Sequence, residues 1–257
     1  MYAAVLSFVT LGSSSPSSSK FAPGWNGLAR TPPLAWRSYN AQVDSQFAMT
    51  QANFVEIIDA LADRSRTVAG VPTSLLDLGY STVGIDGGYE LCPGGTGHDA
   101  DGRPIINTAT FPNITALAAH AHALRIKLGW YLNVCGCPEK VEKAINYEGD
   151  VKSLFALGFD GAKFDGCGSQ MNSTFYAELM NTTGKSFLIE NCHWGVVTMD
   201  DTSSVPTREW CPMNFYRTSG DIRETWNSWT RNLLTVVPFL NLTDPLSMPS
   251  WCVFWFC

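Results

Sequence analysis

The chain has 257 residues, of which 45% are hydrophobic and 16% charged, so it can bury a sizeable core and has the size of a single barrel or a large α/β domain. Its 23 acidic and 17 basic residues give a net charge of −6 without a Lys/Arg cluster, which argues against binding of nucleic acid or another polyanion. Beyond the N-terminus no apolar run reaches the roughly 18 residues that a membrane span needs, so we expect a soluble protein that does not enter membranes.

The N-terminal segment, the cysteines and the sequons together predict the cellular location of the protein. Residues 1–12, MYAAVLSFVTLG, form an apolar run followed by SSSPSSSK, which is typical of a signal peptide except that a basic start is lacking. We expect residues 1–20 to be either a signal peptide or disordered. Eight cysteines fit an oxidising compartment, and four glycosylation sequons support it, at Asn113, Asn172, Asn181 and Asn241. The sequence therefore predicts a glycoprotein that is secreted or vacuolar/lysosomal.

Candidate strands and helices alternate along the chain. In order they are strand 34–40, helix 51–66, strand 80–88, helix 113–124, strand 127–134, helix 140–157, strand 161–167, helix 173–181, strand 186–192, strand 215–221 and helix 222–236. Such alternation predicts a parallel sheet covered by helices. The sequence contains no G-x-G-x-x-G motif and no P-loop, which argues against a nucleotide-binding version. We therefore expect an α/β fold of the (β/α)8 barrel type.

The predicted barrel is incomplete. Six strands can be counted, whereas a closed (β/α)8 barrel has eight. Residues 25–250 are assigned to the barrel, and residues 251–257 form an apolar tail without turn residues or charge. Because a chain end normally lies in water, this tail indicates a chain cut short.

Four carboxylates fall at or near predicted strand ends, at Asp86, Asp165, Glu190 and Asp221. Catalytic groups of such barrels lie at the C-terminal ends of the strands, and a pair of carboxylates is what cleavage of a glycosidic bond requires. Lys163 points to the same side of its strand as Asp165, and its positive charge would keep that carboxylate ionised. A buried Asp–Lys pair with a purely structural role explains the same pattern, so both readings stay open.

Six segments carry a resemblance to a known family. They are NGLARTPPLAWRSYN, YSTVGIDGGYE, HDADGRPIINTATFPN, LRIKLGWYLNV, LGFDGAKFDGC and YRTSGDIRETW. In that order they resemble the melibiase group, the α-galactosidases and α-N-acetylgalactosaminidases of glycoside hydrolase family 27. The resemblance runs from about residue 25 to residue 250 and is most specific at K-F-D-G-C and R-x-x-x-D-I. It implies a (β/α)8 barrel followed by a small antiparallel β domain, and a retaining mechanism without metal or cofactor.

The resemblance assigns the catalytic roles. Asp165 would be the nucleophile and Asp221 the acid/base. Lys163 and Arg217 would contact sugar hydroxyls and tune the two carboxylates. The implied reaction is removal of a terminal α-linked galactose from an oligosaccharide or glycoconjugate.

Further residues would bind the sugar. Asp86 matches the first of two adjacent acidic residues that hold hydroxyls, and Trp36 and Tyr131 match aromatic residues that line the pocket. His193 falls where relatives often place an acidic or sugar-binding residue; it would either line the pocket or serve as a hydrogen-bonded loop histidine.

Two positions depart from the family pattern. Gly87 stands in place of the second adjacent carboxylate, and Tyr39 stands where many relatives have Trp. Losing one hydrogen-bonding group should loosen or redirect specificity. Galactose is therefore the first expectation, with β-L-arabinopyranose and α-N-acetylgalactosamine as alternatives.

The cysteines favour disulfides. Cys135 and Cys137 near Cys167 could be drawn as a zinc site, but there is no C-x-x-C pair and no histidine at ligand spacing. The family resemblance implies bonds Cys137–Cys167 and Cys192–Cys211. The partners of the others stay open, namely Cys92, Cys135, Cys252 and Cys257.

The absence of the C-terminal part of the family pattern lowers the hydrolytic activity that we predict. Relatives continue past PLSMP with further strands and a β domain, so we expect this chain alone to hydrolyse an α-galactoside weakly or not at all. Two non-enzymatic readings also remain, a sugar-binding relative without turnover and an inert fragment. The sequence retains four residues of the catalytic pattern, Asp165, Asp221, Lys163 and Arg217. This argues against the sugar-binding relative, because binding alone needs no nucleophile.

Overall fold

The structure, a computed structural model, describes residues 26–29, 31, 33–44, 47–137, 139–192, 212–217, 220–223 and 225–235. The predictions for residues 1–20, for the sequon at Asn241 and for the tail 251–257 lie outside these residues. No helix in the described part of the chain is long and apolar enough to cross a membrane.

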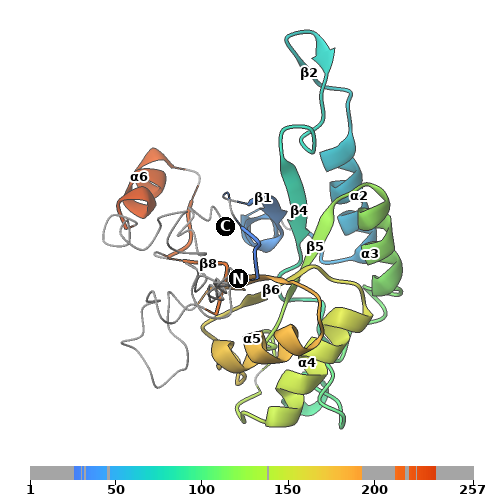
Figure 1. Ribbon diagram of the computed structural model, residues 1–257, viewed down its shortest axis with the longest axis vertical. Helices are drawn as coiled ribbons and strands as arrows, with labels where there is room; N and C mark the ends of the chain where they lie inside the picture. Colours follow the sequence, from blue (N-terminus) through green and yellow to red (C-terminus); the bar gives the residue numbers. More distant parts are fainter. Residues whose placement is uncertain are drawn as a thin grey trace, which may run out of the picture.

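One parallel sheet organises the molecule (Figure 1). Its strands follow the order β1-β4-β5-β6-β7-β8, and each neighbouring pair is parallel. The strands are β1 (Leu34–Arg37), β4 (Tyr80–Gly84), β5 (Lys127–Tyr131), β6 (Gly161–Phe164), β7 (Leu188–Asn191) and β8 (Phe215–Tyr216). Every one lies within a predicted strand, which confirms the parallel sheet expected from the alternation.

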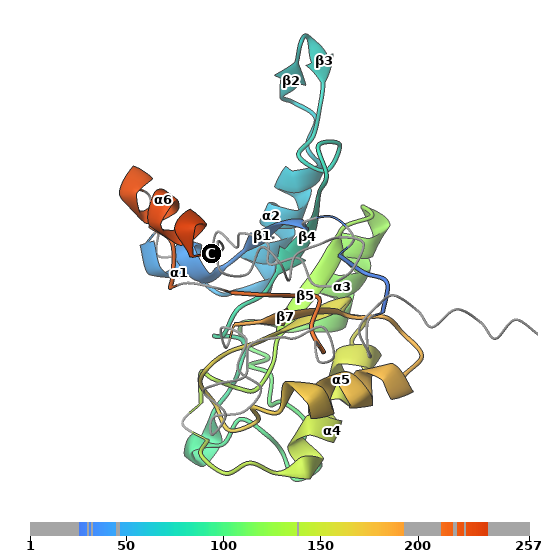
Figure 2. The same cartoon turned by 60° about the vertical axis from the view of Figure 1, so that its left-hand side comes forward.

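Helices follow the strands, as Figures 1 and 2 show. They are α2 (Gln51–Ala62), α3 (Ile114–Ala123), α4 (Ala144–Ala156), α5 (Ser173–Thr182) and α6 (Trp226–Leu234). Side chains of Thr50, Asn113 and Asn172 accept a backbone N–H in the first turn of α2, α3 and α5. Two predicted sequon asparagines therefore also serve as helix caps.

Three elements were not expected from the sequence. A short helix α1 (Tyr39–Asp44) follows β1, and a 3-10 turn η1 (Pro93–Gly95) lies in the segment after β4. An exposed hairpin of β2 (Thr67–Val68) and β3 (Val71–Pro72) projects from the molecule (Figure 2).

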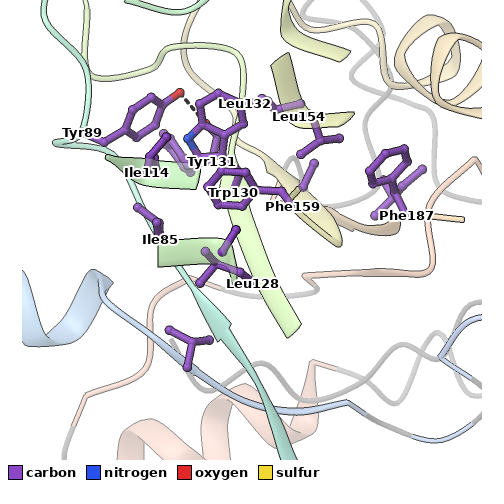
Figure 3. Close-up of a cluster of buried hydrophobic side chains, with 14 of the residues drawn as sticks. Ile85, Tyr89, Ile114, Leu128, Trp130, Tyr131, Leu132, Leu154, Phe159 and Phe187 are labelled. Atoms are coloured by element: carbon purple, nitrogen blue, oxygen red, sulfur yellow. Dashed lines mark hydrogen bonds between the residues drawn. The ribbon is translucent and has the colours of Figure 1, made fainter. Parts of the chain in front are cut away.

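The outward face of the sheet forms the hydrophobic core with the helices. Val83, Leu128, Trp130 and Phe164 point to this side and pack in one buried cluster with side chains of α2 to α5. Trp130 is fully buried, and its ring stacks on Phe159 with 4.8 Å between centroids. Figure 3 shows this packing around Trp130. Truncation of such a ring costs about 3–5 kcal/mol.

The inward face is polar and lined by glycines. Arg37 lies against Gly84, where an added Cβ would come within 2.7 Å of the guanidinium carbon. Gly129 and Gly161 border the same hollow, together with Glu190. The sheet thus has helices α2 to α5 on one side and charged groups on the other, which is the arrangement of a (β/α) barrel wall.

Candidate active site

Polar side chains gather where the strands end. Because the C-terminal ends of parallel strands meet at one edge of the sheet, groups far apart in sequence come together there. The contributors are Asp86 after β4, Tyr131 at the end of β5, Asp165 after β6, Cys192 after β7 and Arg217 after β8.

Asp165 is held as a carboxylate. The Tyr131 hydroxyl donates to its Oδ2 at 2.7 Å, and the Gly166 N–H donates to its Oδ1 at 2.6 Å. Burial alone would raise the pKa of Asp165, but the Tyr131 hydrogen bond and the charge of Lys163 outweigh it and lower the pKa. The group is therefore ionised at neutral pH, as a nucleophile must be.

Asn133 fixes the backbone around Asp165, a role the sequence analysis missed. Its Nδ2 donates to the carbonyl oxygens of Asp165 at 2.8 Å and Cys167 at 2.7 Å, and its Oδ1 accepts from the Asp165 N–H at 3.2 Å. Asn133 itself has a left-handed φ of 59° and is fully buried. An asparagine directly after an apolar strand was the only sequence signal.

Asp86 is bound by two cations. Lys163 Nζ donates to Oδ1 at 2.6 Å, and Arg37 Nη1 contacts Oδ2 at 3.4 Å. The Ser38 hydroxyl also accepts from the Asp86 N–H at 3.0 Å. Asp86 is only 2% exposed. Both of its carboxylate oxygens are thus already engaged by this chain.

Arg37 and Glu190 complete the charged interior. Arg37 Nη2 donates to Glu190 Oε2, and both side chains are buried. Burial raises the pKa of Glu190, while Arg37 and Lys163 oppose the increase. The sequence analysis noted Glu190 at a strand end but missed Arg37, although a lone arginine in the apolar strand LAWR carries the same kind of signal as Lys163.

The second predicted carboxylate lies in contact with Arg217. Arg217 Nη2 donates to Asp221 Oδ1 at 2.7 Å. Asp221 also interacts with Tyr39, whose pKa is raised by burial and by this neighbouring carboxylate. The Lys163 ammonium lies between two tyrosine rings, 5.6 Å from the centroid of Tyr39 and 5.5 Å from that of Tyr131.

Cys192 lies in contact with the arginine that holds Asp221. Arg217 Nη1 donates to its Sγ at 3.1 Å. Burial raises the pKa of Cys192 to about 12, so the thiol is neutral and can donate. Arg217 therefore contacts both the Cys192 thiol and the Asp221 carboxylate.

The predicted disulfide pairing is wrong. Cys137 bonds Cys92 and Cys167 bonds Cys135, rather than Cys137 bonding Cys167. Cys135 is the cysteine whose Cα lies 5.0 Å from that of Cys167, within bonding geometry. The zinc alternative fails for the same reason: sulfurs of Cys135 and Cys167 lie within 4.8 Å of each other and of an Asp165 oxygen, but they are bonded together.

The second predicted bond is also not formed. Cys192 is a free, buried thiol in contact with Arg217. Its expected partner Cys211 lies outside the described residues, as do Cys252 and Cys257.

Trp36 is placed differently from the prediction, and His193 lies outside the described residues. The Trp36 ring packs edge-on against Phe47 and Phe54, with centroids 5.4 and 5.9 Å away, on the helix side of β1. Since side chains alternate along a strand, the inward position next to it is taken by Arg37. Trp36 thus belongs to the core packing rather than to the pocket.

The arrangement suits acid/base and nucleophilic chemistry on a neutral, hydroxyl-rich substrate. Asp165 is ionised and anchored by donors, and Asp221 is held by Arg217 at the same edge of the sheet. Two carboxylates at one rim are what cleavage of an acetal linkage employs.

Comparison with known proteins points the same way. Residues 31–241 match the family model described as "Alpha galactosidase A". An α-galactosidase of Oryza sativa subsp. japonica is 32% identical over 80% of this chain and 46% of its own length. An α-N-acetylgalactosaminidase of Gallus gallus is 28% identical over 79% of this chain and 51% of its own length. The chain thus spans about half the length of the curated relatives it matches.

Solved structures share the fold. An α-galactosidase of Saccharomyces cerevisiae superposes with a TM-score of 0.60 at 21% identity, over 79% of this chain and 43% of that one. A putative α-galactosidase of Bacteroides fragilis gives 0.59 at 25% identity, over 77% of this chain and 40% of that one. These likenesses confirm the barrel fold predicted from the sequence.

Proposed function

Because the chain belongs to the alpha galactosidase A family, we propose that it carries the catalytic centre of a retaining glycoside hydrolase that removes terminal α-linked galactose. The observation that carries this proposal is an ionised Asp165, held by Tyr131, at the same strand-end edge of the sheet as Asp221, which Arg217 contacts. The names of the relatives, α-galactosidase and α-N-acetylgalactosaminidase, support the substrate class.

The reaction follows from the two carboxylates. In the first step Asp165 attacks the anomeric carbon while Asp221 gives its proton to the departing oxygen, so the glycosidic bond breaks and a glycosyl ester forms on Asp165. In the second step Asp221 takes a proton from water, whose oxygen attacks the same carbon and releases Asp165. Two inversions leave the configuration retained. This mechanism needs the carboxyl groups about 5–5.5 Å apart.

Three neighbouring groups support these steps. Tyr131 and Lys163 stabilise the charge of Asp165 before attack and after release. Arg217 orients Asp221 through the 2.7 Å contact, from the strand next to the one that holds Cys192.

A panel of p-nitrophenyl glycosides tests the proposal. The α-galactoside should be hydrolysed in preference to the α-N-acetylgalactosaminide and the β-L-arabinopyranoside, with NMR showing the α-anomer of galactose as first product. Asp165→Asn should abolish turnover and preserve binding. Binding without turnover by a chain extended to the length of its relatives would instead indicate a sugar-binding relative, and inversion would refute the double displacement.

We also propose a secreted or vacuolar/lysosomal location. The two disulfides, Cys92–Cys137 and Cys135–Cys167, support an oxidising compartment. Asn181 is exposed at the end of α5 and open to glycosylation. Release of an N-glycan by a glycosidase, read as a mass decrease of the native protein, tests this location; an unmodified protein in the cytosolic fraction would contradict it.

A further inference from the structure

Glu90 is a buried carboxylate at the wall of the candidate site that the mechanism above does not use. It is 9% exposed and lies in the segment between β4 and η1. Its Oε2 accepts the Gly88 N–H at 2.5 Å. Its Oε1 is buried and has no hydrogen-bond partner among the described residues. A buried acceptor left unsatisfied costs about 1–3 kcal/mol, so its persistence calls for an explanation.

The surroundings of Glu90 place it at the site. A Cβ built on Gly87 would lie 3.6 Å from Glu90 Oε1 and 3.3 Å from Cε1 of Tyr131. Cε1 is bonded to the ring carbon that carries the hydroxyl contacting Asp165. The unpartnered oxygen therefore lies near the end of the Tyr131 side chain that holds the nucleophile.

The Glu90 carboxylate lies next to the backbone of two glycines, Gly87 and Gly136. A Cβ on Gly136 would lie 3.3 Å from Glu90 Oε2, so Glu90 fits between Gly87 and Gly136. Gly87 is half-buried, while Gly88 and Gly136 are exposed. No side chain of these three residues stands between Glu90 and a ligand at the strand ends.

The other acidic groups near Tyr131 are already committed. Both oxygens of Asp86 are engaged by Lys163 and Arg37, and Asp165 is assigned to the anomeric carbon. A sugar offers hydroxyl donors that need acceptors, and sites that supply such acceptors discriminate strongly. Among the described residues the buried carboxylate oxygens without a hydrogen-bond partner are Glu90 Oε1 and Glu190 Oε1, and Glu190 is already paired with Arg37 through its other oxygen.

We propose that Glu90 is a specificity-determining residue that accepts a hydrogen bond from a ring or hydroxymethyl hydroxyl of the sugar. The inference rests on the proposed function, because it assumes that a galactoside occupies the site. Gly87 then has a physical role: a side chain there would compete with Glu90 for the space beside Tyr131. Burial raises the pKa of Glu90, while backbone N–H groups of Glu90 and Gly88 oppose the increase.

Titration of the whole chain with free galactose and its 2-, 4- and 6-deoxy derivatives, followed by NMR, tests the inference. Glu90→Ala should weaken galactose binding at least about tenfold, the loss expected for one hydrogen bond to a charged acceptor. The deoxy sugar that lacks the hydroxyl bound by Glu90 should bind the unaltered chain about as weakly as galactose binds Glu90→Ala. Glu90→Ala should not weaken binding of that deoxy sugar further. Glu90→Gln, which keeps the shape, should give an intermediate loss, and Glu178→Gln on exposed α5 serves as the matched control.

The outcomes separate the two proposals. If both Glu90 variants bind galactose like the unaltered chain while Asp86→Asn weakens binding, the Glu90 assignment is overturned and the proposed function stands. Equal weakening of every sugar, including the deoxy forms, would show a structural role only and also overturn it. If the unaltered chain binds none of these sugars, both the proposed function and the assignment of Glu90 are contradicted.

Discussion

The hydroxyl of Tyr131 donates a 2.7 Å hydrogen bond to Oδ2 of Asp165, from the end of the neighbouring strand. This contact, with the charge of Lys163, lowers the pKa of Asp165 despite its burial. The stabilisation is present above the unfolded pKa of about 3.9 and is lost as pH falls through the lower folded value. The nucleophile is thereby kept ionised in mildly acidic solution.

Tyr131→Phe should therefore raise the pKa of Asp165. We expect the acid limb of the kcat/KM profile to move up by about 1 pH unit, because a hydrogen bond to a charged group is lost. Tyr176→Phe, which removes a hydroxyl bonded to Asp150 away from the site, is the matched control. If the acid limb of the kcat/KM profile does not move in Tyr131→Phe, this hydroxyl does not control the ionisation of Asp165.

The Cys135–Cys167 disulfide should matter for both stability and turnover. It closes a loop of sequence separation 32 and brackets Asp165, so its loss should cost about 3–4 kcal/mol of unfolding free energy. The double variant Cys135→Ser/Cys167→Ser should also lower kcat. Cys92→Ser/Cys137→Ser, with separation 45, should lose similar stability and retain more of kcat. Equal kcat losses for the two pairs would contradict a local role at Asp165.

Arg37 should be essential to the barrel interior. Arg37→Met leaves Glu190 without its ion-pair partner and Asp86 with only Lys163, and such a break of a buried pair costs about 3–5 kcal/mol. Arg37→Met/Glu190→Gln should recover part of that loss, because the uncompensated charge is also removed. Urea denaturation of the unaltered chain, Arg37→Met and the double variant measures the three free energies of unfolding. A double variant less stable than Arg37→Met would contradict this reading.

His98 should make stability depend on pH. Its Nδ1 lies 2.6 Å from Glu139 Oε2 and its Nε2 lies 3.2 Å from Asp150 Oδ1, and Asp150 also accepts from Tyr176. Burial alone would lower the pKa of His98, but Asp150 and Glu139 outweigh it and raise the pKa. Burial raises the pKa of Asp150 as well. At His98 and Asp150 the folded state therefore holds protons more tightly than the unfolded state.

The resulting stability is fully present below the unfolded His pKa of about 6.5 and is lost as pH rises through the higher folded pKa. The loss of stability in His98→Asn should thus be larger at about pH 5.5 than at about pH 8.5. Exposed His120, which contacts Asp59, gives the control His120→Asn, with a small effect at both values. A loss that does not change with pH would rule out His98 protonation as the cause.

The sheet could be predicted because its signals are local. Apolar strands alternate with amphipathic helices, and Gly158, with φ of +87°, follows the end of α4. The predicted helix 51–66 stops at Ala62 instead, since the chain turns into the exposed β2–β3 hairpin, which has no buried face to mark it. Only packing of the whole chain reveals that turn.

The candidate site was predicted in part. Lys163 and Asp165 stand out as charges in an apolar strand, but the roles of Arg37, Asn133 and Glu90 depend on partners distant in sequence. The disulfide pairing was wrong because Cys135 and Cys137 differ by two positions in a tight turn, and only its geometry decides which one faces Cys167.

The most direct test of the central claim is covalent trapping on Asp165. An activated fluorinated galactoside that forms the glycosyl ester but slows its hydrolysis should add one sugar per chain, and mass spectrometry should locate it in the peptide 161–170. Asp165→Asn should remain unlabelled. A sugar attached elsewhere, no attachment, or equal labelling of Asp165→Asn would contradict the assignment of Asp165 as nucleophile.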